Sequence, residues 1–300
     1  MLPNFIIAGG VASGTSFLSA MLAHHPEVYL PRIQRPEPNF FHYSWKFDLG
    51  LEWYQNTWFT EAGSQRAIGE RSSLLLTSDV AAKRIRQSLP DIKIIFCLRN
   101  PIERAWANYR FSVLEGLEPL SFDEAIECES LRMRQAVGKW AEVQPHAYLT
   151  RSKYSAHLQE YLELFDREQI LLLKSEDMSK HPHDTLGRVC EFLDISPSIQ
   201  LPLPPNYSSP SVIDRQLQVA LRKKLGDKFS EIIELIRKED SPSTEAGSEE
   251  FARHIELLRV NLESGKAKIP ESSRQRLHSL LDEEIARTRK LVDFSVDDWT

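Results

Sequence analysis

The sequence predicts an α/β fold, with a mostly parallel central sheet, helices on both faces and a helical C-terminal extension. Short, almost wholly apolar runs at 5–8, 94–98 and 169–173 alternate with segments whose apolar residues recur at helical spacing. Strands that are apolar on both sides are typical of parallel sheets covered on both faces. The final third of the chain is instead amphipathic and charged, which predicts helices only.

The first element is a strand at 5–8, followed by the loop GGVASGTS at 9–16 and a helix from Thr15 to about His24. Two glycines five residues apart and a Thr-Ser pair match the spacing of a phosphate-binding loop, except that Thr15 stands where such loops carry lysine. Backbone N–H groups at this kind of turn bind anions. A tight strand–helix turn without a ligand explains the same residues.

The next strong signal is the strand at 91–98, which runs directly into Arg99-Asn100-Pro101. Ligands of open α/β sheets bind at the carboxyl ends of the strands. Arg99 therefore lies where a guanidinium suits a phosphate group. The alternative interpretation, a surface ion pair with Glu103, is more credible for Arg104 than for Arg99. Pro101 is expected at the start of a helix that runs through Tyr109.

The other elements follow from weaker patterns. Short strands are expected at 28–30 and 67–69, and the pair Ser121 and Glu124 predicts a capping box at the start of a helix. Further helices are expected within 49–59 and at 79–88, 154–165 and 184–193, and a loop at 201–211. Helices at 214–238, 249–262 and 272–292 flank a polar linker at 239–248. We interpret residues 1–300 as one domain with a helical insertion or appendage at about 214–290.

Composition excludes several classes of protein. The chain has 300 residues, 41% of them hydrophobic and 27% charged, with a net charge of −6, which argues against a nucleic-acid partner. Its three cysteines have neither CxxC nor metal-ligand spacing, so no metal site is predicted and a reducing compartment is favoured. No run approaches the ~20 apolar residues of a membrane span. No signal peptide is visible, and we expect a cytoplasmic protein.

Five motifs together resemble the sulfotransferases that use 3′-phosphoadenosine-5′-phosphosulfate (PAPS). These are GGVASGTS, HPEVYLPRIQRPEPNFF, GERSSLLL, LRNPIERAWANY and the stretch from YLTRSKYSAHL to FLDI; the closing RKLVDFSVDDW agrees too. The resemblance implies a P-loop NTPase-like fold with PAPS as co-substrate. It implies in-line transfer of a sulfuryl group to a hydroxyl or amine of a small-molecule, carbohydrate or lipid acceptor, with no metal. Residues 235–270 have no counterpart in this pattern.

The resemblance also implies the site. The loop residues that would hold the 5′-phosphosulfate are Gly10, Val11, Ala12, Ser13, Gly14, Thr15 and Ser16. Arg99 and the position of Ala107 correspond to the pair that binds the 3′-phosphate. Residues near the nucleotide would be Arg151, Ser152, Lys153 and Tyr154. Glu37 corresponds to the catalytic base, and His42 is an alternative base, since histidine titrates near neutral pH.

Two positions depart from the family pattern. Ala12 stands where relatives carry lysine or arginine, and Ala107 where they carry serine. Arg71, at the end of a predicted strand, is the first candidate to replace the missing cation; weaker candidates are Arg32, Arg35 and Arg151.

Three functional classes follow from these residues. The first is a sulfotransferase. The second is a catalytically weakened protein of this fold that binds a nucleotide or a partner, since both departures remove polar groups that would face the donor. The third, a P-loop kinase or ATPase, is disfavoured by Thr15. Neither the acceptor nor the oligomeric state follows from the sequence.

Overall fold

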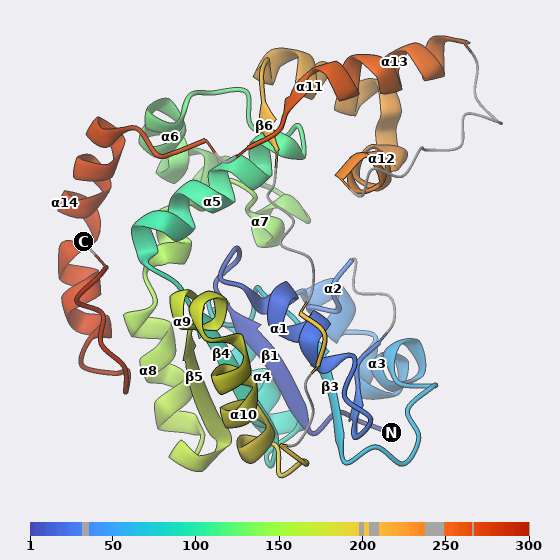
Figure 1. Cartoon of the computed structure of the whole chain (residues 1–300), viewed down its shortest axis with the longest axis vertical. Coiled ribbons are helices and arrows are strands. Elements are labelled where there is room, and N and C mark those ends of the chain that lie inside the picture. Colours follow the sequence, from blue (N-terminus) through green and yellow to red (C-terminus); the bar gives the residue numbers. More distant parts are fainter. Residues whose placement is uncertain (32–35, 198–200, 204–209, 238–248, 266, 300) are drawn as a thin grey trace. The chain divides into compact units, whose positions relative to one another are not determined.

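The computed structural model describes residues 1–31, 36–197, 201–203, 210–237, 249–265 and 267–299. Within these residues a five-stranded parallel sheet has the order β2-β3-β1-β4-β5 (Figure 1). Its strands are β1 (Phe5–Gly9), β2 (Val28–Tyr29), β3 (Ala67–Arg71), β4 (Lys93–Leu98) and β5 (Ile170–Lys174). The predicted α/β class with a mostly parallel sheet is confirmed.

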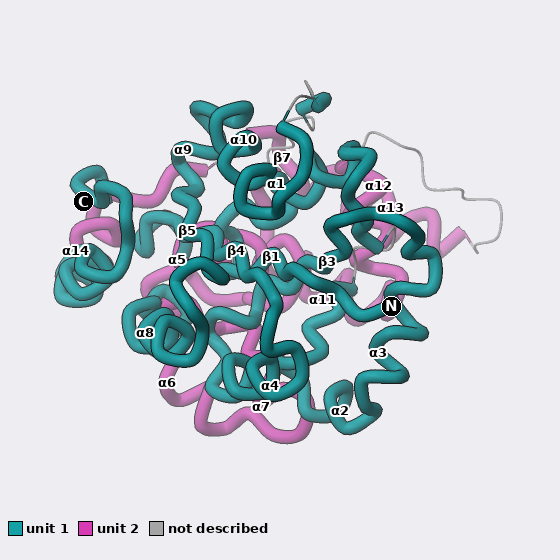
Figure 2. Tube along the Cα trace, turned by 90° about the horizontal axis from the view of Figure 1, so that it is seen from below, with its two compact units in different colours: residues 1–104, 150–204, 278–300 teal, residues 105–149, 205–277 magenta. Residues whose placement is uncertain are grey.

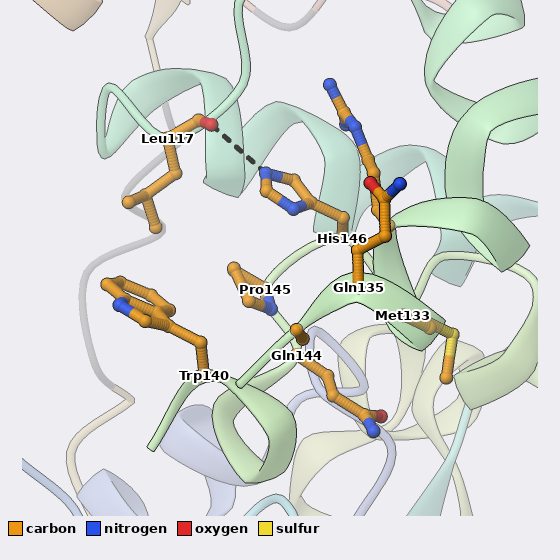
Figure 3. Close-up of a pocket in the computed structure, with 9 residues that line it drawn as sticks. Leu117, Met133, Gln135, Trp140, Gln144, Pro145 and His146 are labelled. Atoms are coloured by element: carbon orange, nitrogen blue, oxygen red, sulfur yellow. Dashed lines mark hydrogen bonds between the residues drawn. The ribbon is translucent and has the colours of Figure 1, made fainter. Parts of the chain in front are cut away.

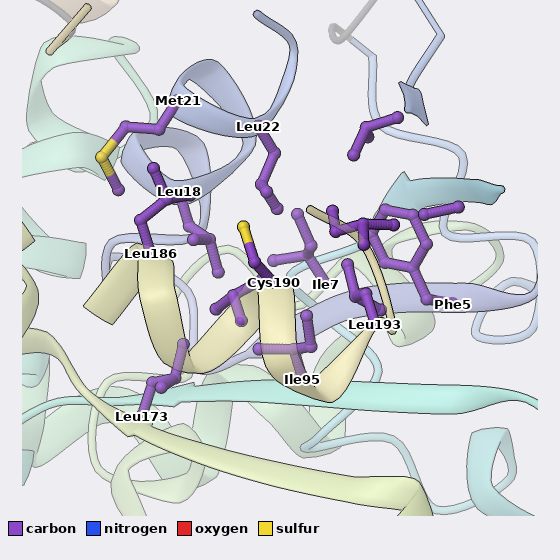
Figure 4. Close-up of a cluster of buried hydrophobic side chains, with 14 of the residues drawn as sticks. Phe5, Ile7, Leu18, Met21, Leu22, Ile95, Leu173, Leu186, Cys190 and Leu193 are labelled. Carbon is purple, nitrogen blue, oxygen red and sulfur yellow. The ribbon is translucent and has the colours of Figure 1, made fainter. Parts of the chain in front are cut away.

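Apolar residues point to both faces of the sheet because successive side chains of a strand alternate. On one face Ile7 and Ile95 pack against two helices, α1 (Thr15–Leu22) and α10 (Pro182–Phe192). Figure 4 shows this cluster, with Leu18 and Leu22 of α1 above the strands and Leu186 of α10 beside them. Burying apolar side chains of this size contributes roughly 1.5–3 kcal/mol each.

The opposite face carries α4 (Ala81–Ser88) and α8 (Ser155–Leu164), as Figure 2 shows. Ile85 of α4 is fully buried, and the ring of Phe96 on β4 lies 4.8 Å from that of Tyr161 on α8. Helices therefore cover both faces, as the apolar strands predict.

The chain divides into two compact units. Unit 1 comprises Met1–Arg104, Thr150–Pro204 and His278–Thr300, and unit 2 comprises Ala105–Leu149 and Pro205–Leu277 (Figure 2). Unit 1 holds the sheet and the glycine-rich loop. It also contains α2 (Ser44–Phe47), α3 (Gly50–Trp58), the 3₁₀ turns η1 (Thr150–Ser152) and η2 (Arg167–Gln169), and α9 (Ser175–Lys180).

The elements of unit 2 are mainly helical. They are α6 (Phe122–Gln135), α7 (Trp140–Val143), α11 (Arg215–Leu225), η3 (Gly226–Lys228), α12 (Phe229–Arg237), α13 (Glu249–Val260) and the antiparallel pair β6 (Ser211–Val212) and β7 (Leu262–Glu263). Helices α5 (Pro101–Leu114) and α14 (Glu271–Thr288) cross the boundary between the units. Unit 2 has its own cluster of buried apolar side chains, which includes Leu221, Phe229 and Leu258. The capping box of Ser121 and Glu124 at the start of α6 is confirmed. The predicted linker at 239–248 lies outside the described residues.

The C-terminal part of unit 1, from His278 in α14 onwards, packs on the rest of that unit. Glu284 of α14 accepts hydrogen bonds from the Ser155 backbone N–H (2.6 Å) and hydroxyl (2.8 Å), which caps the start of α8. Trp299 is 1% exposed, with its ring 6.5 Å from that of Tyr154. Lys174 at the end of β5 donates to the Ser295 carbonyl at 2.9 Å. These contacts tie residues 278–299 to the carboxyl end of the sheet.

Candidate functional site

The glycine-rich loop has the backbone shape of an anion site. Gly14, directly before α1, has φ +90°, and Ala12 has φ +69°. Left-handed residues alternating with ordinary ones turn successive N–H groups towards one side, which creates a concavity for an anion. The first N–H groups of α1 have no partner within the helix, and the helix dipole favours negative charge there. The φ of +90° at position 14 is strained for any residue with a side chain, which explains the glycine; an added Cβ would also lie 2.8 Å from Met178 Cε.

Two guanidinium groups donate hydrogen bonds to backbone carbonyls of this loop. Arg99 Nη1 donates to the Ala12 carbonyl at 3.1 Å, and Arg104 Nη1 donates to the Val11 carbonyl at 3.3 Å. By binding these carbonyls, both arginines fix the peptide orientation. They also add positive charge beside a loop suited to anions. The strand-end arginine and the loop, far apart in sequence, therefore lie together in unit 1.

The expected surface pair of Arg104 with Glu103 is wrong. Arg104 is completely buried, and its Nε donates to the Ser152 hydroxyl at 2.8 Å. Arg99, 30% exposed, is the arginine near Glu103, at 3.9 Å. The reason is that Arg104 has hydrogen-bond partners 48 and 93 residues away in sequence, Ser152 and Val11, which hold its side chain in the interior.

Residues 150–154 are adjacent to the same loop through Arg104. The Ser152 hydroxyl donates to the Pro101 carbonyl at 2.9 Å, and the Tyr154 hydroxyl donates to the Arg99 carbonyl at 3.1 Å. Burial raises the pKa of Tyr154 to about 12, so this hydroxyl remains a donor at neutral pH. Arg151 is 5% exposed, whereas the Lys153 side chain is exposed.

Arg71 connects the loop to the candidate base. It is the last residue of β3, and its side chain is 5% exposed. Nη1 donates to the Ser16 hydroxyl at 3.0 Å and forms an ion pair with Glu37 Oε1. A planar guanidinium suits such a double contact because its donors diverge in fixed directions.

The Glu37 carboxylate is held by neutral donors as well. Oε2 accepts from the Ser73 N–H (2.8 Å), the Ser73 hydroxyl (2.7 Å) and Asn39 Nδ2 (3.2 Å). Lys46 Nζ fixes the backbone by donating to the carbonyls of Glu37 (3.1 Å) and Pro38 (2.5 Å). The carboxylate is 15% exposed, so it is oriented and still accessible.

Next to Arg71 on β3, Glu70 is fully buried. Burial raises the pKa of Glu70 to about 8, and the nearby charge of Glu37 adds to the rise. The acid is therefore mainly neutral at pH 7. Tyr54 is fully buried too and belongs to the core, with its ring stacked on that of Phe40 at 4.4 Å between centroids.

The other sequence-predicted residues lie as follows. His42 is half-buried, and its ring is 4.8 Å from that of Tyr43. Ala107 lies on α5, half-buried, in the part of that helix that belongs to unit 2. Arg32 and Arg35 lie outside the described residues.

The comparison with known proteins decides the family. A family model described as "Sulfotransferase domain" matches residues 2–260. The chain belongs to the sulfotransferase domain family. Curated sulfotransferases are similar: membrane-associated sulfotransferase kil1 of Dictyostelium discoideum is 24% identical over 65% of this chain and 56% of its own length. Human heparan sulfate glucosamine 3-O-sulfotransferase 3B1 is 29% identical over 65% of this chain and 46% of its own length.

The chain therefore spans about half the length of these sulfotransferases. A solved sulfotransferase structure from Alicyclobacillus acidocaldarius matches the fold with a TM-score of 0.70, at 22% identity, over 100% of this chain and 99% of its own. Among the residues that the structure describes, no group of side chains has the make-up of a metal site. None of the described helices is both long and apolar enough to span a bilayer.

Sequence reasoning missed three residues of this candidate site. Lys46 and Ser73 position Glu37, and Arg104 supports the loop. Ser73 follows Arg71 by two residues, and this position just after the end of β3 was the one feature of the sequence that could have indicated its role. Lys46 and Arg104 act through contacts that no local spacing reveals.

Proposed function

We propose that this protein transfers the sulfuryl group of PAPS to a hydroxyl or amine by in-line displacement. One observation carries the proposal: the buried guanidinium of Arg71 contacts both Ser16 of the anion loop and the carboxylate of Glu37. A cation between a phosphate-type loop and a positioned carboxylate is the arrangement that a charge-separating group transfer requires.

The donor would occupy the loop at Gly10–Ser16. When bound, PAPS supplies an activated sulfuryl group on its 5′-phosphate. The N–H groups of the loop would hold that end, with the hydroxyls of Thr15 and Ser16 as further donors. Arg99 would contribute charge for the 3′-phosphate, as the resemblance implies. Its present bond to the Ala12 carbonyl keeps it beside the loop.

Arg71 would replace the cation that Ala12 lacks. Its guanidinium already touches the hydroxyl of Ser16, so it is near the place where negative charge grows on the leaving oxygen. Permanent charge in a site with 5% side-chain exposure acts more strongly than the same charge in water. Arginine is suited to this role because one fork can serve the leaving group and still orient Glu37.

Glu37 would act as the general base. As the acceptor oxygen bonds to sulfur and the sulfur–oxygen bond to the 5′-phosphate breaks, the acceptor proton moves to the carboxylate. Ser73 and Asn39 hold that carboxylate in one orientation, which reduces the entropy lost on reaching the transition state. His42 remains the alternative base. Because several similar curated proteins are named as heparan sulfate sulfotransferases, a carbohydrate acceptor is the first class to test.

Calorimetry with adenosine 3′,5′-bisphosphate tests the donor site. Saturable binding is expected, and it should weaken in Arg99→Met. Arg66→Met serves as a matched control, because the side chain of Arg66 is 65% exposed and the residue lies outside the proposed donor site. No heat at millimolar nucleotide would remove PAPS from the proposal. Sulfated product from PAPS and a panel of carbohydrate, phenol and lipid acceptors, detected by mass spectrometry, then tests the transfer.

The variant Ala12→Lys distinguishes a site in which Arg71 replaces the missing loop cation from a site that has lost its activity. Ala12→Gln is the uncharged control of similar length. If Arg71 supplies the cation, Ala12→Lys should not raise turnover. An inert wild type together with an active Ala12→Lys variant would instead identify a loop that has lost its function.

A further inference from the structure

A second pocket lies within unit 2, formed wholly by residues between Leu117 and His146. Its volume is about 380 Å³, within the range typical of small-molecule sites. Helices α6 and α7 and the segment after α7 line it (Figure 3). None of its residues belongs to the anion loop or to the Glu37 cluster, so the transfer reaction does not account for it.

One side of the pocket is apolar. In Figure 3 the indole of Trp140, the ring of Pro145 and the side chain of Leu117 lie together on this side. Trp140 is 52% exposed, which is unusual for so large an apolar surface. An exposed indole beside a pocket provides a flat apolar platform for a ring.

The other side offers hydrogen bonds. His146 Nε2 lies 3.1 Å from the Leu117 carbonyl. That contact places the proton of the neutral ring on Nε2, so Nδ1 is an acceptor. Gln135 adds an amide with both donor and acceptor atoms beside it (Figure 3). A ligand group that both donates and accepts, such as a hydroxyl, satisfies this pair.

The charge of the lining argues against an anion. Arg132 donates through Nη1 to Glu118 Oε2 at 2.6 Å and through Nη2 to Oε1 at 3.1 Å. Glu118 is completely buried and also accepts from the Tyr148 hydroxyl at 2.8 Å. The Arg132 guanidinium is thus neutralised and held in place by Glu118.

We propose that this pocket binds a neutral sugar ring, with its apolar C–H face on Trp140 and its hydroxyl edge towards Gln135 and His146. A purely aromatic ligand would leave Gln135 and Nδ1 of His146 without partners, which is unfavourable on desolvation. The inference goes beyond the proposed transfer reaction and does not depend on it.

Saturation-transfer NMR and calorimetry on the whole chain, without nucleotide, test the pocket with cellotriose, maltotriose and chitotriose, and with phenol as the aromatic probe. A trisaccharide should bind, and Trp140→Ala should weaken it about tenfold, the size expected for losing one stacked ring. Gln135→Ala should weaken it less. Val137→Ala removes an exposed apolar side chain (77%) outside the lining and should change nothing.

Three results would overturn the inference. They are no binding of any trisaccharide, trisaccharide binding that Trp140→Ala leaves unchanged, and binding of phenol in preference to the sugars. Thermal unfolding of Trp140→Ala checks that the variant folds; a half-exposed indole predicts little change. Nucleotide calorimetry on the same samples keeps the two proposals apart, because loss of sugar binding with intact nucleotide binding refutes only this one.

Discussion

Replacing Arg71 by methionine should affect stability and activity to different extents. The guanidinium is 5% exposed and bridges Ser16 and Glu37. Breaking a buried ion pair typically costs 3–5 kcal/mol. Here Glu37 retains the two donors of Ser73 and that of Asn39, so we expect a loss nearer 2–3 kcal/mol, the value of one or two charge-assisted hydrogen bonds.

The effect on transfer should be larger. Removing a donor that stabilises transition-state charge lowers kcat by about 100- to 1,000-fold. Arg71→Lys keeps the charge but loses the fork, so we expect a decrease of about tenfold. In Arg71→Met/Glu37→Gln, stability should partly recover because the uncompensated carboxylate is gone, whereas activity should not.

Initial rates of sulfated-product formation and urea unfolding measure the two effects in the same preparations. Lys83→Met is the matched control, since Lys83 also pairs with a glutamate but its side chain is 66% exposed. Such surface pairs contribute little. Wild-type turnover in Arg71→Met, or a double variant as unstable as the sum of its single changes, would refute the role assigned to Arg71.

Three further predictions concern unit 1. Because the pKa of Glu70 rises from 4.5 to about 8 on folding, the wild type should lose stability relative to Glu70→Gln as the pH increases from 4.5 to 8. At about 1.4 kcal/mol per pKa unit, the difference in unfolding free energy between the two proteins should change by about 5 kcal/mol over this range. A difference that does not vary with pH in urea unfolding would contradict this. Gly14→Ala places a Cβ at φ +90° against Met178, so it should lose about 1–3 kcal/mol by denaturation and bind nucleotide more weakly; wild-type values would count against the loop geometry. Trp299→Ala removes a side chain that is 1% exposed, and we expect a loss of about 3–5 kcal/mol together with weaker nucleotide binding in calorimetry; unchanged melting would contradict this.

The sheet was predictable because its central strands are apolar on both sides. β3 was only partly so: it extends through Glu70 and Arg71, two charged residues that local preference places outside a buried strand. These two residues are tolerated for different reasons, since burial keeps Glu70 mainly neutral and Arg71 has an ionic partner. α9 escaped notice because its sequence, SEDMSK, is polar.

The candidate site was predictable where residues follow strand ends. The loop at Gly10–Ser16 and Arg99 lie together, as their places after β1 and β4 imply. Arg104 was assigned to the surface because a charged residue next to Glu103 has an obvious local partner. Its actual contacts, to Val11 and Ser152, depend on tertiary packing that brings remote residues beneath the loop.

The three-part make-up of unit 1 has a consequence for biosynthesis. Translation delivers two segments of unit 1, 1–104 and 150–204, with residues 105–149 of unit 2 between them, and then residues 205–277 of unit 2. Only after these come Glu284, the cap of α8, and Trp299, the neighbour of Tyr154. While the ribosome is still extending that intervening segment, the α8 cap and the Tyr154 contact cannot form. The contacts at the carboxyl end of the nascent sheet are therefore completed late, and this interval is when chaperone binding should matter most.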